Sequence, residues 1–198
     1  GPGGVDTLED AILWARYKSG AFDVVGVVLV GWSIGCVALR EQLRAGAQPT
    51  AVLALDGCSG SVPPTPAQLE PWQQAAARAR AGEMLLVLSH TSMSYTEHLP
   101  VGERYLSAAN GCRRITGWDL PDAGPLDAPA ITRDGSLIVA SYQSGSVDAQ
   151  AHRDQQHHAM PDMLRRFVVP WVEHGETAPP TQRHGTPPTR GDGILRRG

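Results

Sequence analysis

Residues Val24 to Leu43 read VVGVVLVGWSIGCVALREQL, and this stretch decides the fold. It begins with the apolar run Val24–Val30, turns at Gly31–Gly35, and continues with apolar residues at helical spacing. The sequence therefore predicts a buried β-strand, a tight turn, and an amphipathic helix that ends near Gly46. A strand that is apolar on both faces is typical of the middle of a parallel sheet that helices cover on both sides.

The rest of the chain continues the alternation of strand and helix. Further strands are predicted at Ala51–Asp56, Met84–Ser89 and Ser136–Tyr142, with a short strand at Cys112–Trp118. Helices are predicted at about 6–18, 69–81, 96–109 and 147–172, the last one restarting at Pro161 and perturbed at Pro170. Residues 121–130 contain three prolines and are expected to form a loop. This order predicts an α/β fold with a mostly parallel sheet flanked by helices.

One domain, residues 1–174, is expected to contain all of these elements. Residues 175–198 are rich in Pro, Gly, Thr and Arg and have no apolar pattern to bury. We expect them to form a non-globular tail. A second copy of the chain or another partner in an assembly is the kind of contact that would hold such a tail in place.

The composition limits the classes of partner. Hydrophobic residues make up 41% of the 198 residues and the formal net charge is -3, which does not favour a nucleic-acid partner. The sequence contains no apolar run long enough to span a bilayer and no pattern of a secretory signal. Three widely spaced cysteines predict reduced thiols and a cytoplasmic location. No residue pattern calls for a metal or a cofactor.

Ser33 is the first candidate for chemistry. In the pattern G-x-S-x-G between a strand and a helix, the serine occupies a strained turn that lifts its hydroxyl above the sheet. The glycines two residues before and two residues after, Gly31 and Gly35, are expected to avoid crowding at that turn. The N-terminus of the following helix directs its N–H groups, and the positive end of its dipole, toward the hydroxyl.

A serine nucleophile needs a base, and the base needs an acid that orients it. In open α/β sheets functional groups gather at the carboxyl ends of the strands. The candidates there are Asp56, which Gly57 follows, then His90, and then Asp148 and His152 after the last strand.

The chain resembles the α/β-hydrolase superfamily, in particular some bacterial and phage-associated hydrolases, over about residues 24–172. The resemblance rests on GWSIGCVALREQL, on LDG at residues 55–57 and on the late histidine His152. It implies the chain order Ser, acid, His, and therefore a triad of Ser33, Asp56 and His152. His90 stays an alternative as base or substrate contact.

The resemblance also implies a role for each residue. Ser33 attacks a carbonyl carbon, His152 transfers the proton, Asp56 orients the imidazole, and the N–H of Ile34 belongs to the oxyanion hole. Trp32 is expected either to line the substrate pocket or to pack beneath the turn. The second oxyanion donor of this superfamily comes from a loop after an early strand. No strand is predicted ahead of the first helix here, so Gly1–Gly4 is either the remainder of that loop or the loop is missing.

The sequence thus predicts a serine hydrolase, a carboxylic ester hydrolase or an amidase, that acts on small or surface-presented acyl compounds. The alternative is a catalytically impaired protein on the same scaffold that serves as a structural or binding subunit, for example in a phage particle. The missing second oxyanion donor and the peptide-like tail favour this alternative.

Overall fold

The protein has a five-stranded sheet at its centre, in the order β1-β2-β3-β5-β4. The computed structural model describes residues 16–18, 26–58, 64–91, 108–143 and 149–175. The strands are β1 (Val28–Trp32), β2 (Ala51–Leu55), β3 (Leu85–Thr91), β4 (Ala130–Asp134) and β5 (Leu137–Tyr142). The pairs β1–β2, β2–β3 and β3–β5 are parallel, and β4 pairs with β5 in the antiparallel direction. The expected mostly parallel sheet is therefore confirmed.

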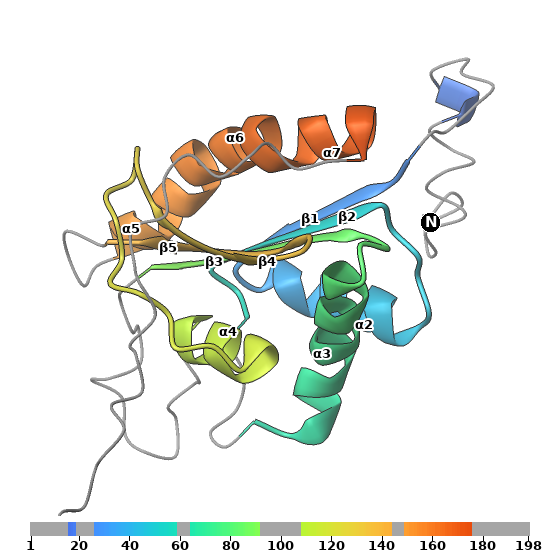
Figure 1. Ribbon diagram of the computed structural model, residues 1–198, viewed down its shortest axis with the longest axis horizontal. Helices are drawn as coiled ribbons and strands as arrows, with labels where there is room; N and C mark the ends of the chain where they lie inside the picture. Colours follow the sequence, from blue (N-terminus) through green and yellow to red (C-terminus); the bar gives the residue numbers. More distant parts are fainter. Residues whose placement is uncertain (1–15, 19–25, 59–63, 92–107, 144–148, 176–198) are drawn as a thin grey trace, which may run out of the picture.

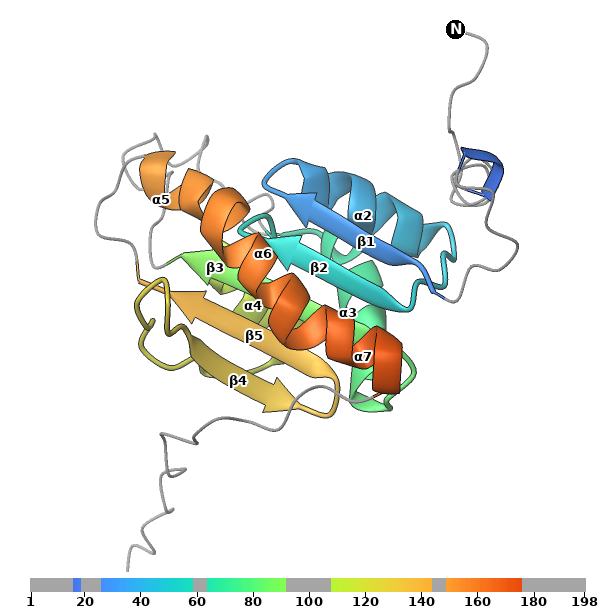
Figure 2. The ribbon, with the colours of Figure 1, turned by 90° about the horizontal axis from the view of Figure 1, so that it is seen from above.

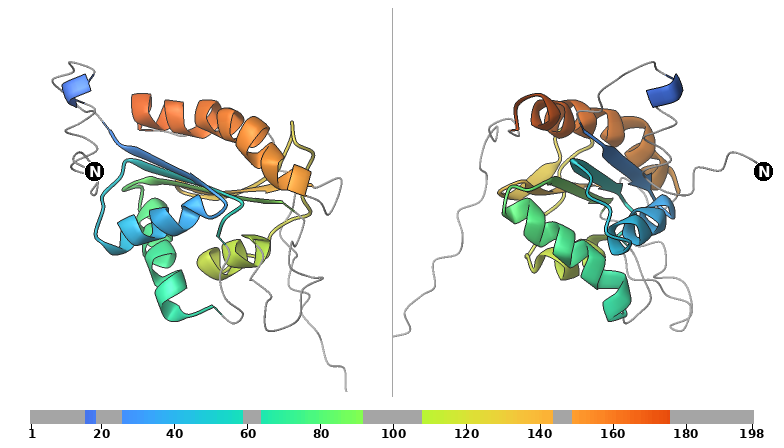
Figure 3. Two further views of the ribbon diagram at one scale, coloured as in Figure 1. Left: turned by 180° about the vertical axis from the view of Figure 1, so that it is seen from behind. Right: turned by 90° about the vertical axis from the view of Figure 1, so that its right-hand side faces the viewer.

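Helices cover both faces of this sheet (Figures 1 and 3). One face carries α2 (Gly35–Arg44), α3 (Pro66–Arg80) and α4 (Ala108–Thr116). The other face carries a long helical segment that crosses the strands obliquely (Figure 2). That segment consists of α5 (Ala149–Asp154), η2 (Gln155–Ala159), α6 (Met160–Met163), η3 (Leu164–Val168) and α7 (Val169–His174), where η denotes π-helix. The result is a three-layer α/β arrangement.

The alternation of side chains along the strands divides the core into two clusters. Val52 and Ala54 of β2 pack toward α2, α3 and α4, whereas Leu53 and Leu55 pack toward the long helical segment. All five residues of β2 are buried, as are all seven of β3. These two strands therefore have the double apolar coverage that is typical of interior parallel strands.

The predicted position of the first strand was wrong. β1 lies at one edge of the sheet that the described residues form, not in its middle, and the side chain of Val30 is 39% exposed. The strand also extends to Trp32, so the turn begins one step later than Gly31. An apolar run indicates contact with helices on both faces, but it does not indicate how many neighbouring strands there are.

Two predictions between β3 and β5 were also wrong. Most of the expected short strand at Cys112–Trp118 lies in α4, which ends at Thr116 and whose buried residues Ala108, Cys112 and Ile115 recur at helical spacing. β4 was not expected at all, because its polar sequence AITRD is that of an exposed edge strand. The dipeptide Asp134-Gly135 is a hairpin signal that could have revealed it, and Gly135 has a φ of 60° in the turn.

The C-terminal helical segment follows the prediction with one change. Pro161 and Pro170 lie in the first turns of α6 and α7, as expected for residues that lack a backbone N–H donor. The π-helical segments η2 and η3 come immediately before these α-helical turns. The hydrogen-bond pattern therefore changes ahead of each proline while the helix stays continuous. Gly175, with a φ of 68°, ends α7.

Several predicted segments fall outside the described residues. These are most of the helix at 6–18, of which 16–18 are helical, most of the helix at 96–109, and the tail after residue 175. Among the described helices, none has both the length and the apolar character that crossing a membrane requires.

Candidate active site

Ser33 follows the last residue of β1 and has a φ of 55°. In the described part of the chain only one other non-glycine residue has a positive φ, namely Asp56 at 44°. Such backbone conformations cost about 1–3 kcal/mol each and are found most often at functional sites. The Ser33 N–H donates a hydrogen bond to the carbonyl of Leu55 at 3.0 Å, which ties this turn to the end of β2.

The two glycines that flank Ser33 differ in what surrounds them. A Cβ on Gly31 would lie 2.7 Å from Leu39 Cδ1 and 3.0 Å from the backbone carbon of Gly35. Among the described residues, a Cβ on Gly35 would have no atom within 4 Å. The expected crowding therefore holds for Gly31, where α2 packs closely on β1. It does not hold for Gly35, where the first residue of α2 faces open space.

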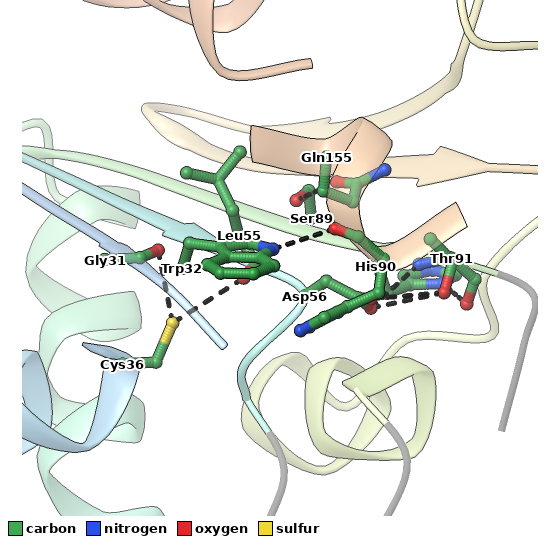
Figure 4. A network of polar contacts seen from close by, with 10 residues as sticks. Gly31, Trp32, Cys36, Leu55, Asp56, Ser89, His90, Thr91 and Gln155 are labelled. Carbon is green, nitrogen blue, oxygen red and sulfur yellow. Dashed lines mark hydrogen bonds and ion pairs between the residues drawn. The ribbon is translucent and has the colours of Figure 1, made fainter. Parts of the chain in front are cut away.

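Asp56 lies at the end of β2, beside Ser33, because Trp32 pairs with Leu55 in the sheet register. Its Oδ1 accepts a hydrogen bond from the Thr91 N–H at 3.0 Å, and the Thr91 hydroxyl lies 3.4 Å from Oδ1 and 3.3 Å from Oδ2 (Figure 4). The side chain of Asp56 is 4% exposed. Thr91, the last residue of β3, thus fixes the carboxylate at the carboxyl ends of the strands.

Gly57 allows the close approach of this loop to the serine turn. A Cβ at this position would lie 2.3 Å from the carbonyl oxygen of Ser33 and 2.4 Å from Cys36 Sγ. The absence of a side chain therefore lets Ser33 and Asp56 occupy neighbouring positions.

His152 comes from α5, 96 residues after Asp56, and meets it at the same edge. Its Nδ1 lies 2.7 Å from Asp56 Oδ2. Because an ionised carboxylate only accepts hydrogen bonds, Nδ1 is the donor, and this assigns the tautomer in which Nε2 can accept a proton. The exposed fraction of the His152 side chain is 13%. The structure thus brings together two of the three residues of the predicted triad in direct contact.

Trp32, the residue before the serine, contacts His152 in two ways. Its indole Nε1 donates a hydrogen bond to the His152 main-chain carbonyl at 2.8 Å. The indole and imidazole rings also face each other, with centroids 4.6 Å apart and planes at 31°. Ser33 is therefore linked to His152 through its own neighbour in the chain. In the described ranges the hydrogen bonds of His152 do not include one from the Ser33 hydroxyl. Such catalytic bonds are often long until substrate binds.

Ile34 is the N-cap residue of α2, and its side chain is 82% exposed. The first N–H groups of a helix have no intrahelical acceptor and carry the positive end of the helix dipole. α2 has no acidic residue in its first turn that would neutralise this potential. Ile34 therefore lies at the positive end of α2, directly after Ser33.

His90 lies in the interior and not beside Ser33. The ring is 3% exposed; Nδ1 donates to the carbonyl of Thr91 at 3.0 Å, and Nε2 lies 2.9 Å from Ser141 Oγ on β5. Burial lowers the pKa of His90, with a smaller contribution in the same direction from Arg113, while Thr91 and Asp56 oppose the shift. The recorded contacts of His90 are thus those of a neutral histidine that joins two interior strands.

Cys36 lies behind the serine turn. Its Sγ points between the carbonyl oxygens of Gly31 at 3.3 Å and Leu55 at 3.9 Å (Figure 4). Burial raises the pKa of this thiol far above its ordinary value, with a smaller contribution from Cys58. All three cysteines are buried free thiols. A thiol of this kind is a packing residue and a poor nucleophile.

The role of Thr91 and the contacts of Trp32 were not predicted from the sequence. Thr91 stands directly after the strand-end residue His90, so its place was a signal for a functional contact. His90 was named as a candidate at this strand end, but Thr91 was not recognised as a residue that could hold a carboxylate. For Trp32 the sequence has no signal, because its partner lies 120 residues further along the chain.

Comparison of the chain with protein-family models, with curated proteins and with solved structures finds no match. Within the described residues, no three His, Cys, Asp or Glu side chains gather in a way that could hold a metal ion.

Proposed function

We propose that this protein is a serine hydrolase of the α/β-hydrolase type that cleaves an ester or an amide bond. The observation that carries the proposal is the 2.7 Å hydrogen bond from His152 Nδ1 to Asp56 Oδ2, at the sheet edge where Ser33 has its strained turn. Buried carboxylate, oriented imidazole and elevated serine hydroxyl are the three parts that nucleophilic acyl transfer needs.

In the proposed reaction the Ser33 hydroxyl oxygen attacks the acyl carbon while His152 Nε2 takes its proton. The carbonyl π electrons move to oxygen, and the N–H of Ile34 donates a hydrogen bond to that oxyanion. When the tetrahedral intermediate collapses, the bond to the leaving group breaks and His152 returns the proton to it. Water then repeats the sequence on the acyl-serine and releases the acid. Asp56 holds the imidazole in the correct tautomer throughout and stabilises its charged form.

The test is labelling with a fluorophosphonate, which reacts only with an activated serine. We expect the wild type to be labelled at Ser33 and to hydrolyse a p-nitrophenyl ester, and we expect Ser33→Ala to lose both. Ser141→Ala is the matched control, because it removes the hydroxyl of the other serine–histidine pair at His90. It should keep both properties. Labelling that survives in Ser33→Ala would refute the proposal, and an unlabelled wild type would favour a binding protein on this scaffold.

A further inference from the structure

Trp32 is placed to hold the catalytic base rather than to contact substrate. It is the last residue of β1, half-buried, and its indole packs on the same side of the sheet as the long helical segment. Its indole N–H and its ring face both meet His152, at 2.8 Å and with a centroid separation of 4.6 Å. A single side chain thus contacts the main chain and the ring of the same histidine.

These contacts complement the one made by Asp56. The carboxylate fixes His152 Nδ1, the indole N–H fixes the carbonyl of the same residue, and the indole face limits the tilt of the imidazole. Asp56 is in turn held by Thr91. Three independent contacts therefore define the position, the rotation and the tautomer of the imidazole.

Trp32 directly precedes Ser33 in the chain, and this position links its contacts with His152 to the nucleophile. Trp32 is joined to Ser33 by one peptide bond, so the side chain that fixes His152 moves with the nucleophile. His152 belongs to α5, a helix of six residues, and lies 120 positions further along the chain. A misplacement of about 1 Å between reacting groups can lower a rate by about 10²-fold. The contacts of Trp32 with His152 oppose such a misplacement of the imidazole relative to Ser33.

We infer that Trp32 is a positioning residue that couples the serine turn to the base, and this inference rests on the proposed function. The substrate-lining role that the sequence allowed for Trp32 makes a different prediction, namely an effect on substrate binding.

The chain offers a matched control in Trp171. Its indole Nε1 donates a hydrogen bond to the carbonyl of Thr50 at 3.1 Å, at the amino ends of the strands. Trp171→Phe therefore removes the same kind of bond from the same core cluster, away from the site. Trp32→Phe removes the N–H and keeps an aromatic face, and Trp32→Leu removes both.

The first measurement needs no substrate. We expect the proton between His152 Nδ1 and Asp56 to give a far-downfield NMR resonance, which would be assigned by its loss in His152→Asn. We expect Trp32→Leu to shift or broaden this resonance and Trp171→Phe to leave it unchanged. An unchanged resonance in Trp32→Leu would overturn the inference, whether or not the protein proves to be a hydrolase. Should Trp32→Leu not fold, Trp32→Phe decides by the same comparison.

The second measurement separates positioning from substrate binding. With a p-nitrophenyl ester we expect Trp32→Leu to lower kcat by about 10- to 100-fold with little change in KM. In Trp32→Phe we expect kcat to fall about fivefold, which is the effect of one hydrogen bond. The kcat of Trp171→Phe should match that of the wild type. A raised KM with unchanged kcat would assign Trp32 to substrate contact and refute the positioning role.

Discussion

Ser33 and Asp56 show how strain and register combine at single residues. Both have a positive φ, and both come directly after strands that pair in register at Trp32 and Leu55. Positive φ is costly for residues with a Cβ, so surrounding contacts must impose it. Here the hydrogen bond from Ser33 to Leu55 and those from Thr91 to Asp56 supply that constraint. Both of these strained residues take part in the proposed mechanism.

Asp56→Asn tests the role of the carboxylate. Asparagine tolerates a positive φ and can still accept the Thr91 N–H, so the fold should persist. The amide cannot hold the correct imidazole tautomer, and we expect ester kcat to fall by about 10³- to 10⁴-fold. Asp134→Asn is the control, since it removes only an exposed ion pair with Arg80 at 3.1 Å. Turnover within a few-fold of the wild type in Asp56→Asn would contradict the prediction.

At the scale of elements, the serine turn depends on how closely α2 packs on β1. Leu39 of α2 covers Gly31 and leaves no space for a Cβ, whereas no described residue comes close to where a Cβ on Gly35 would lie. The helix is also tied to the sheet edge by Cys36, whose thiol meets the carbonyls of Gly31 and Leu55. The two glycines of the motif should therefore respond differently to substitution.

Gly31→Ala should lower the free energy of unfolding by about 1–3 kcal/mol, because the new methyl group overlaps Leu39. Gly35→Ala should change it by no more than about 0.5 kcal/mol, because its methyl group enters open space at the start of a helix. Urea unfolding of the two variants beside the wild type measures both values. Equal losses, or a larger loss in Gly35→Ala, would show that this packing is not as described.

The long helical segment is tied to the sheet by a buried polar pair. The Ser89 hydroxyl of β3 donates to Gln155 Oε1 at 2.7 Å, and both residues are fully buried. Among the described residues, Gln155 Nε2 has no hydrogen-bond partner. Gln155 lies three residues after His152, so the pair fixes the C-terminal end of α5 against β3.

Gln155→Leu should lower the free energy of unfolding by about 1–3 kcal/mol, because it leaves the Ser89 hydroxyl buried without an acceptor. Adding Ser89→Ala removes the unpaired group, and the double variant should regain most of that loss. Denaturant unfolding of the wild type, both single variants and the double variant completes the cycle. Additive losses would mean that the two side chains do not interact.

At the scale of the whole molecule, two core clusters on opposite faces of the sheet hold the three layers together. His90 joins β3 to β5 on the face that α4 covers, where Arg113 is among the charges that act on it. Burial keeps this imidazole neutral in the folded state, which lowers its pKa from the ordinary value of 6.5. Folding and protonation of His90 therefore oppose each other.

The free energy of unfolding should consequently depend on pH. Above 6.5 the histidine is neutral in both states and the stability is complete. As the pH falls below that value the unfolded chain binds a proton that the folded protein does not, and stability is lost until the lowered folded pKa is passed. Unfolding measured from about pH 8 to about pH 5 should show a steeper loss for the wild type than for His90→Gln. Parallel curves would contradict this account.

The layers and most strands could be predicted from local patterns. Runs such as AVLAL and LLVLS mark buried strands, because an interior parallel strand must be apolar on both faces. These local patterns gave the wrong element where the structural surroundings of a segment decide its conformation. Cys112 lies in a helix that was not predicted, because its neighbours in the sequence are polar. The strand β4 was missed because, as an exposed edge strand of a hairpin, it is polar.

The candidate site divides in the same way. By itself the sequence determined the serine turn, because strand, G-x-S-x-G and helix are local and carry their own steric reason at Gly31. It also placed Asp56 and His152 at strand ends. Only the tertiary structure decided that these two side chains meet, that Thr91 holds the carboxylate, that Trp32 contacts His152, and that His90 lies in the interior. Such contacts join residues up to 120 positions apart. Their geometry depends on the register of neighbouring strands and on how a helix docks on a sheet, and local sequence does not specify either.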